Sequence, residues 1–249
     1  MKFKRLIILF CFLALSTFCL AADGLEGDAF YAKGQYKEAI ASYQSVINGG
    51  QQSAALFYNL GNAYFKSGEL PSAILYFEKA RLLSPGDEDI NHNIRFASTR
   101  TVDKIEEAPQ FFLTKWWNGI VLRFSVDNWA IIAVVTLITA SILLITYFFS
   151  LKPAIKKVSF FLAIAFFVAA LLSILMAKNQ VDYFSTNKQG IIFASVANVK
   201  SSPATQAKTA FVLHEGTKVN LKETSGGYTR IILANGTEGW LKSNDIKEI

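Results

Sequence analysis

Hydrophobic and polar positions change their spacing along the chain, and each change marks a different kind of element. The first 22 residues pass from basic to apolar to small side chains. Residues 23–108 place apolar side chains at helical spacing, whereas residues 128–151 and 158–177 are continuous apolar runs. From residue 190 to 249 the apolar positions alternate as they do in strands. The pattern predicts a helical region, a pair of membrane-spanning helices and a small all-β domain, in that order.

The helical region repeats itself after 34 residues. Small residues let two helix backbones approach, and aromatic residues fill the space between them. A period of about 34 residues with this pattern is typical of tetratricopeptide (TPR) helix pairs. The positions that recur are Gly27 and Gly61, Phe30 and Tyr64, Gly34 and Gly68, Ala39 and Ala73, Tyr43 and Phe77, and Val46 and Ala80.

The second copy, FYNLGNAYFKSGELPSAILYFEKARLLSP, resembles the TPR consensus over its length. The first copy departs from it, with Glu26 where leucine is usual and Gln51 where the closing proline is expected. The acidic stretch that follows Pro85 suits a helix N-terminus and predicts a third, capping helix. Residues 23–108 are therefore expected to form a short TPR array with its cap.

Residues 109–127 are aromatic and amphipathic, and they lead directly into the first apolar run. We expect a helix lying in the membrane interface, with a core helix against the repeats as the alternative. The two apolar runs carry no charge and exceed the roughly 18 residues that mark a spanning helix. They are predicted to be transmembrane helices, with residues 152–157 as the loop between them and residues 178–189 as a linker after them.

Residues 190–249 contain Asn235-Gly236, a strong hairpin signal between two strand-like runs. They also contain the stretches Asn198-Val199-Lys200, Leu213 to Thr217 and Asn235 to Trp240. On these stretches, residues 190–249 resemble the bacterial SH3 (SH3b) domain along their whole length. Tyr228 departs from it, because a tryptophan is commoner there. The predicted fold class is a multidomain membrane protein: all-α tetratricopeptide helical repeats, a two-helix transmembrane hairpin and a small all-β SH3-like barrel.

Residues 1–22 have the basic, apolar and small-residue regions of a secretory signal peptide, with cleavage expected after Ala21 or Ala22. Lipidation at Cys19 and an uncleaved anchor are the alternatives. Cys11 and Cys19 are the only cysteines, so the remaining chain has no disulfide and no cysteine-ligated metal.

Three lysines and no acid occupy the short stretch between the apolar runs: Lys152, Lys156 and Lys157. The positive-inside rule places this loop in the cytoplasm. The signal segment gives an independent argument, because it exports the residues that follow it. Both arguments predict a multi-pass protein of the bacterial inner membrane with its N- and C-terminal modules in the periplasm.

Charge and motifs exclude several functions. The net charge of +6 comes largely from bases beside the apolar runs, which does not describe a groove for nucleic acid. His92 and His214 lie in different modules without a second ligand at metal-binding spacing. No G-x-S-x-G, Walker A or dinucleotide-binding glycine pattern occurs. We therefore expect no enzyme, no metal and no cofactor.

The remaining chemistry is binding. In TPR arrays the first helix of each pair lines a concave groove, and by resemblance the inner positions of the second copy are Tyr58, Asn62 and Phe65. Lys66 lies nearby and His92 lies in the capping helix, and both are further candidates for binding a partner. The alternative is that Tyr58 and Phe65 only pack against the first copy. In the SH3-like part the aromatic candidates for a proline-rich or glycan ligand are Tyr228 and Trp240, with a core position as the alternative for Trp240.

The order of modules resembles the BatE-type proteins of the Bacteroides aerotolerance (Bat) operon over nearly the whole chain. The resemblance implies von Willebrand factor A-type and other Bat proteins as envelope partners, and a complex linked to oxidative-stress tolerance. The expected function is a non-catalytic inner-membrane scaffold that presents both modules for protein–protein interaction. The alternative is an envelope sensor that binds peptidoglycan through the SH3b domain.

Overall fold

The computed structural model describes residues 25–249 except 107 and 110. The predicted signal segment lies outside the described residues. The chain divides into two compact units, Met1–Gln51 and Gln52–Ile249, and each is considered by itself.

The first unit contains a helix pair, α2 (Leu25–Ala32) and α3 (Tyr36–Asn48). The turn between them uses Gly34 at φ 74°, a conformation that glycine adopts without strain. Gly27 faces Tyr43 closely enough that a β-carbon on the glycine would lie 2.5 Å from the ring. The Tyr43 hydroxyl donates to Asp28 Oδ1 at 2.6 Å, which fixes the ring across the pair.

The second unit begins with three helices, α4 (Ala54–Ser67), α5 (Leu70–Leu83) and α6 (Glu88–Ser98), which we call the helical module. Ser53 caps α4 by accepting from the Leu56 amide, and Gly68 ends it in the left-handed conformation. A β-carbon on Gly61 would lie 2.6 Å from the Phe77 ring. This contact repeats the one between Gly27 and Tyr43, so the period of 34 residues describes a structural repeat.

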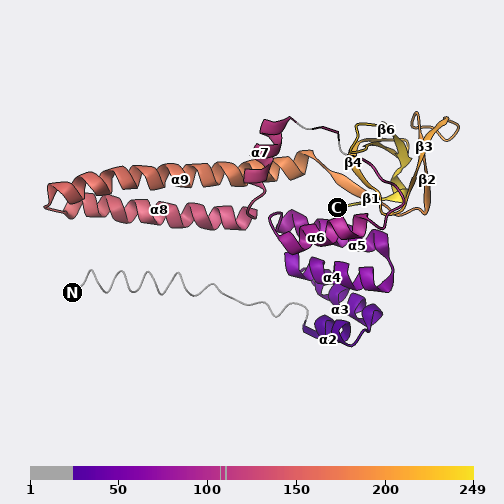
Figure 1. Ribbon diagram of the computed structural model, residues 1–249, viewed down its shortest axis with the longest axis horizontal. Helices are drawn as coiled ribbons and strands as arrows, with labels where there is room; N and C mark the ends of the chain where they lie inside the picture. Colours follow the sequence, from indigo (N-terminus) through magenta and orange to yellow (C-terminus); the bar gives the residue numbers. More distant parts are fainter. Residues whose placement is uncertain (1–24, 107, 110) are drawn as a thin grey trace. The chain divides into compact units, whose positions relative to one another are not determined.

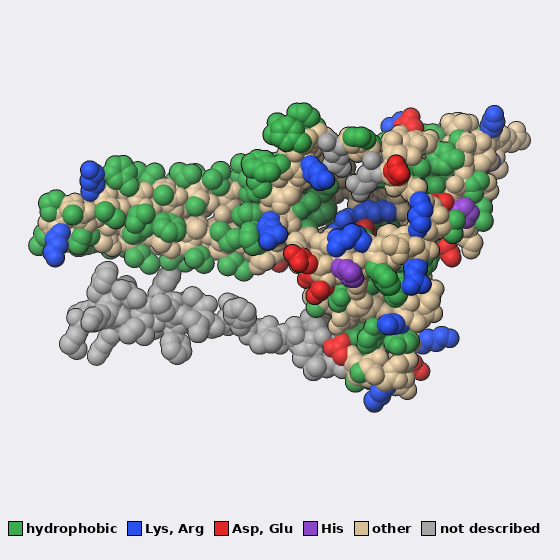
Figure 2. Space-filling model, viewed as in Figure 1, with side chains coloured by type: hydrophobic (Ala, Val, Ile, Leu, Met, Phe, Trp, Pro, Cys, Tyr) green, Lys and Arg blue, Asp and Glu red, His purple; other side chains and the backbone are tan. Residues whose placement is uncertain are grey.

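Helix α7 (Phe112–Val121) precedes two long helices, α8 (Val126–Phe149) and α9 (Pro153–Thr186), which lie side by side and antiparallel (Figure 1). Both long helices are long and apolar enough to cross a membrane, with mean hydropathy of 2.5 and 2.8. Their outer surfaces are covered with hydrophobic side chains, as is α7 (Figure 2). The buried positions between them are mostly small: Ala133, Ala140, Ala163, Ala170 and Ser173.

The long helices differ from the sequence expectation in where α9 begins and ends. It begins at Pro153, inside the predicted loop of residues 152–157, and it ends at Thr186, inside the predicted linker of residues 178–189. Proline is favoured in the first turn of a helix, because its missing N–H has no partner there. At the other end the helix continues past residue 177, where the predicted apolar run stops, because the backbone hydrogen bonds of a helix do not depend on hydropathy.

The C-terminal part, residues 189–249, is a small all-β domain that we call the β module. Its neighbouring strands are antiparallel in the order β3-β2-β6-β5-β4-β1-β7, and a short 3-10 helix, η1, precedes the last strand. The elements are β1 (Gln189–Ile192), β2 (Val196–Lys200), β3 (Thr209–His214), β4 (Lys218–Ser225), β5 (Tyr228–Ile232), β6 (Glu238–Lys242), η1 (Ser243–Asp245) and β7 (Ile246–Glu248).

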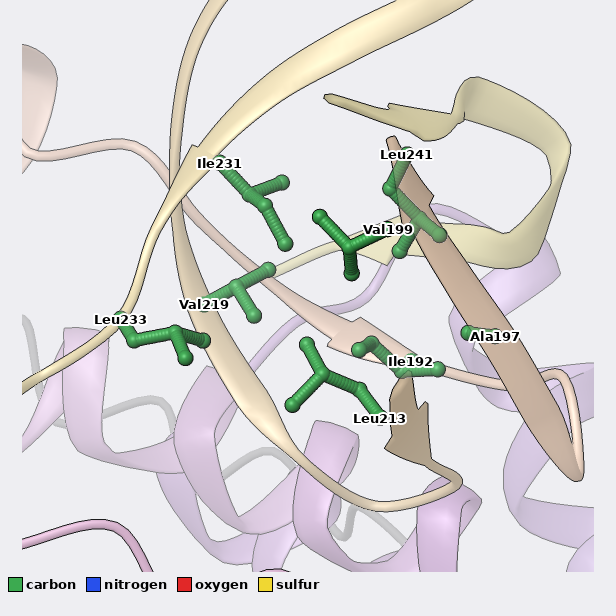
Figure 3. Packing of buried hydrophobic residues seen from close by; sticks show 8 residues of the cluster. All are labelled: Ile192, Ala197, Val199, Leu213, Val219, Ile231, Leu233 and Leu241. Atoms are coloured by element: carbon green, nitrogen blue, oxygen red, sulfur yellow. The ribbon is translucent and has the colours of Figure 1, made fainter. Parts of the chain in front are cut away.

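The β module has one apolar core, to which most of its strands contribute (Figure 3). The predicted hairpin at Asn235-Gly236 joins β5 to β6, with Gly236 at φ 88°. Ile105, from the segment after α6, packs against the same core. The core residues are Ile192, Ala197, Val199, Leu213, Val219, Ile231, Leu233 and Leu241.

Candidate functional site

Helix α4 contributes one wall of a groove in the helical module. Asn62 lies four residues after Tyr58, and Phe65 and Lys66 lie three and four residues after Asn62, so these side chains occupy one side of the helix. The first three are half-buried and Lys66 is exposed. The structure thus brings together the four α4 residues that the sequence predicted.

The facing wall comes from α6, through Asn93 and Phe96. The Asn93 side-chain amide donates to Asn62 Oδ1 at 2.9 Å and to the Tyr58 hydroxyl at 3.1 Å. Phe96 lies against Phe65, with 5.5 Å between ring centroids. These contacts hold α4 and α6 at a fixed separation and leave a cavity of about 190 Å³. It is lined by Asn62, Phe65, Lys66, Phe77, Asn93 and Phe96.

The predicted His92 is at the rim of this groove. Its ring is exposed and stacks on Phe96 with 6.5 Å between centroids, and the Arg100 guanidinium lies 5.3 Å from the same Phe96 ring. The polar side chain that reaches α4 from α6 is that of Asn93, the residue after His92. Sequence reasoning missed Asn93 and Phe96, although an asparagine and an aromatic residue three positions apart on a capping helix are a detectable signal.

The groove combines apolar rings with polar groups that remain available. Asn62 Nδ2 and Lys66 Nζ have no hydrogen bond to any of the described residues, and both carry only donors. Phenyl rings accept an apolar side chain, the amide can donate to a peptide carbonyl, and the ammonium attracts a carboxylate. This combination fits an extended or helical peptide segment with an acidic group.

Tyr228 and Trp240 lie on the outer face of the β module. In the register of β5 and β6, Tyr228 is opposite Lys242 and Arg230 is opposite Trp240, so all four side chains share the face that points away from the core. Tyr228 is only 6% exposed, whereas Trp240 is half-buried and is not part of the core cluster. Arg230 pairs with Glu223 and Glu238 beside them.

The three lysines lie where α8 turns into α9. Lys152 directly precedes α9, and Lys156 and Lys157 are in its first turn and a half. All three are exposed, and Lys156 Nζ lies 5.9 Å from the Tyr147 ring. Within the part of the chain that the structure describes, none of the three lysines forms a salt bridge with a carboxylate.

Contacts between the helical module and the β module form a seam centred on Asp103. This carboxylate accepts from the Thr217 hydroxyl at 2.6 Å and from the His214 amide at 2.7 Å, and His214 Nδ1 lies 2.9 Å away. An ionised carboxylate only accepts, so Nδ1 must carry the proton. Burial alone would raise the pKa of Asp103, but the hydrogen bonds from Thr217 and His214 and the charge of His214 lower this pKa below its ordinary value.

A second ionic contact crosses the seam. Glu78 is 2% exposed and pairs with Arg81 at 2.6 Å in its own helix and with Lys218 of β4 at 2.9 Å. Beside it, burial and the neighbouring charge of Lys247 lower the pKa of Lys79. The seam also contains a cavity of about 420 Å³. Sequence reasoning did not find this contact, since 111 residues separate Asp103 from His214.

The part of the chain that the structure describes contains no cluster of three or more His, Cys, Asp or Glu side chains that could hold a metal ion.

Known families match three segments of the chain. Residues 27–68 match the family described as TPR repeat, residues 54–87 match the tetratricopeptide repeat, and residues 195–247 match the bacterial SH3 domain. No curated protein matches this sequence. The TPR and SH3 predictions are confirmed, and both are domain types that usually serve in binding rather than in catalysis.

Proposed function

We propose that this protein is a non-catalytic scaffold of the bacterial inner membrane that holds a peptide segment of an envelope protein in the groove between α4 and α6. The observation that carries the proposal is the convergence of Asn62, Phe65 and Lys66 with Asn93 and Phe96 around one cavity. TPR repeats are interaction modules, and here the residues that face the groove have the apolar and donor groups that a peptide requires.

The two long apolar helices and the lysines between them support a membrane location with both modules on the exported side. Exposed hydrophobic side chains cover α8 and α9, and apolar surfaces of this length favour a lipid environment. Lys152, Lys156 and Lys157 at the turn favour a cytoplasmic position for it. The predicted signal segment argues for the same orientation.

The module order further supports a place in a Bat-type envelope complex. The resemblance to BatE-type proteins implies von Willebrand factor A-type proteins and other Bat proteins as the partners, and oxidative-stress tolerance as the process. The acidic group that Lys66 would attract is then expected on a partner segment exposed to the periplasm.

Site-specific crosslinking tests the groove. A photo-reactive phenylalanine analogue is placed at Phe65 and, as the control, at Leu83, an exposed residue of α5 outside the groove. The proposal expects an adduct with an envelope protein at Phe65 that disappears when Asn62→Leu and Lys66→Glu are added. Equal adducts at both positions, or an adduct that persists in the Asn62→Leu, Lys66→Glu protein, would contradict it.

Peptidoglycan binding by the β module is the second candidate. It is favoured by the bacterial SH3 match and by Trp240, which lies on the outer face and not in the core. The test is retention of the detergent-solubilised full chain on purified sacculi. Retention that Trp240→Ala abolishes and Asn62→Leu leaves intact would favour this function over the scaffold, and no retention would reject it.

A further inference from the structure

A pocket lies between the first half of α6 and the end of α7, where the helical module meets the segment that enters α8. Its volume is about 490 Å³, within the range of small-molecule sites. The side chains that give it its chemistry are Glu88, Asn91, Arg95, Asn118 and Arg123. It is separate from the groove between α4 and α6 and from the seam around Asp103.

Direct contacts fix the walls of the pocket. Gly86 packs so closely on the carbonyl group after α7 that a β-carbon there would lie 2.8 Å from the Arg123 carbonyl carbon. The Asn91 amide donates to the Pro85 and Asp87 carbonyls at 2.9 and 2.7 Å, which holds the turn before α6. The pocket is therefore not a gap between mobile parts.

The pocket lies at the level expected for lipid headgroups. Helix α7 runs across the end of the α8–α9 pair rather than along it, with hydrophobic side chains on its surface (Figures 1 and 2). Phe112 and Trp116 are 70% and 62% exposed, as expected of aromatic anchors at a membrane interface. Trp129 of α8 donates from Nε1 to the Val121 carbonyl at 3.1 Å, which fixes the bend just beside Arg123.

The pocket is lined by two arginines and one glutamate. Arg95 and Arg123 are exposed, and neither has a carboxylate within 4.0 Å among the described residues. Guanidinium groups match the oxygens of a phosphate in a bidentate manner. Glu88 adds one carboxylate to the same pocket, which disfavours a purely anionic ligand and favours one that also carries an ammonium group.

We propose that this pocket binds the zwitterionic phosphoethanolamine headgroup of a phospholipid, with Arg95 and Arg123 on the phosphodiester and Glu88 on the ammonium. The inference rests on the membrane location proposed above, and it adds a lipid site that neither the TPR groove nor the SH3 match implies. A bound headgroup joins the helical module to the membrane surface and so orients the groove between α4 and α6.

Competitive lipid retention tests the proposal. The full chain is purified in detergent with equal amounts of phosphatidylethanolamine, phosphatidylglycerol and phosphatidylcholine, and the retained lipids are counted by native mass spectrometry. We expect preferential retention of phosphatidylethanolamine. The Arg95→Gln, Arg123→Gln protein should lose at least about tenfold in retention, because tenfold is the value of one charge-assisted contact and the variant removes two. Glu88→Gln should remove the preference over phosphatidylglycerol, and Lys115→Gln on exposed α7 is the matched control.

Three outcomes would overturn the proposal. These are equal retention of the three lipids, a preference that Glu88→Gln does not change, and full displacement of the lipid by inorganic phosphate, which would identify a free-phosphate site. Equal melting temperatures of the variants verify folding. Carbonate extraction of membranes is performed in parallel: a chain that stays in the membrane without lipid preference contradicts only this inference, whereas an extracted chain contradicts the membrane location itself.

Discussion

At the residue scale, Gly61 and Phe77 show why the repeat needs its small residues. The Phe77 ring is 1% exposed and lies where a β-carbon on Gly61 would be. Gly27 and Tyr43 reproduce this geometry in the first copy, with a similar separation. A side chain of any size at either glycine therefore competes with an aromatic ring that has no room to move.

We predict that Gly61→Ala destabilises the helical module by about 1–2 kcal/mol. Overpacking costs about 1–3 kcal/mol, and the better helix propensity of alanine returns up to about 1 kcal/mol. Hydrogen exchange of the α4 and α5 amides measures the change. Phe77→Leu makes room for the extra methyl group, so the double variant should lose less than the sum of the two single variants. If the loss of stability in the double variant equals the sum of the two single losses, the contact between residue 61 and the Phe77 ring is not the cause of the destabilisation.

Asp103 makes the contact between the helical module and the β module sensitive to acid, because the hydrogen bonds and the charge at this seam lower its pKa. Its pKa is lowered in the docked structure, so the docked state binds fewer protons than a separated state, in which the pKa returns to its ordinary value of about 3.8. Ionised Asp103 therefore contributes its full stabilisation of the docked state at pH values above this ordinary pKa. The contribution is lost as the pH falls from the ordinary pKa through the lowered pKa of the docked state.

We predict that the seam holds from neutral pH down to about pH 5 and loosens below about pH 4. Hydrogen exchange of the His214 amide, which donates to Asp103, measures this directly. Asp103→Asn should raise the exchange at pH 7 and remove its acid dependence. Glu215→Gln removes an exposed charge from the neighbouring turn and is the control. An acid transition of unchanged size in Asp103→Asn would assign the titration to another group.

At the scale of elements, the sequence predicts what is local and periodic. The 34-residue repeat, the two apolar helices and the Asn235-Gly236 hairpin follow from side-chain spacing, which acts within a few turns or strands. The α4 residues of the groove follow as well, because they lie on one helix. Asn93 does not follow from the sequence, since choosing it over His92 requires the rotation of α6 about its axis, and that rotation is set by packing against α5 and α4.

The charges at the start of α9 have no local explanation. Lys156 and Lys157 lie near a helix N-terminus, where positive charge opposes the helix dipole and typically costs about 0.3–1 kcal/mol each. Helix stability alone would favour acids at these positions. Their presence is explained if the turn between α8 and α9 has to remain in the cytoplasm.

We predict that replacing Lys152, Lys156 and Lys157 by glutamate loosens the membrane orientation without unfolding α9. Acids suit the helix start, so a change in topology cannot be ascribed to loss of the helix. A reporter fused after Ile249 should become partly cytoplasmic. The matched control replaces three exposed lysines of the β module, Lys208, Lys222 and Lys242, by glutamate. A reporter that stays fully exported would mean that the N-terminal segment alone sets the orientation.

At the scale of the whole molecule, the seam joins elements that the sequence separates by the entire α8–α9 helix pair. Asp103 precedes α7, and His214, Thr217 and Lys218 follow α9. Sequence patterns could not predict this, since the periodicity of each element says nothing about which distant element it meets, and each polar group is explained locally as a helix, turn or strand residue. Ile105 strengthens the contact by packing against the β-module core.

Asp103, through its hydrogen bonds to His214 and Thr217, and Lys218, through its ion pair with Glu78, make the side-chain polar contacts described at this seam, so their joint loss should let the two modules move more independently. Lys218→Met leaves Glu78 its pairing with Arg81, so the helical module keeps its fold. Spin labels at the exposed residues Leu83 and Val212, in a protein with Cys11→Ser and Cys19→Ser, report the separation of the modules. We expect one narrow distance in the parent protein and a broad distribution in Asp103→Asn, Lys218→Met. A distribution that stays narrow would show that the remaining contacts, among them Ile105 and the hydrogen bond from the Ala108 amide to the Ala234 carbonyl, hold the modules together.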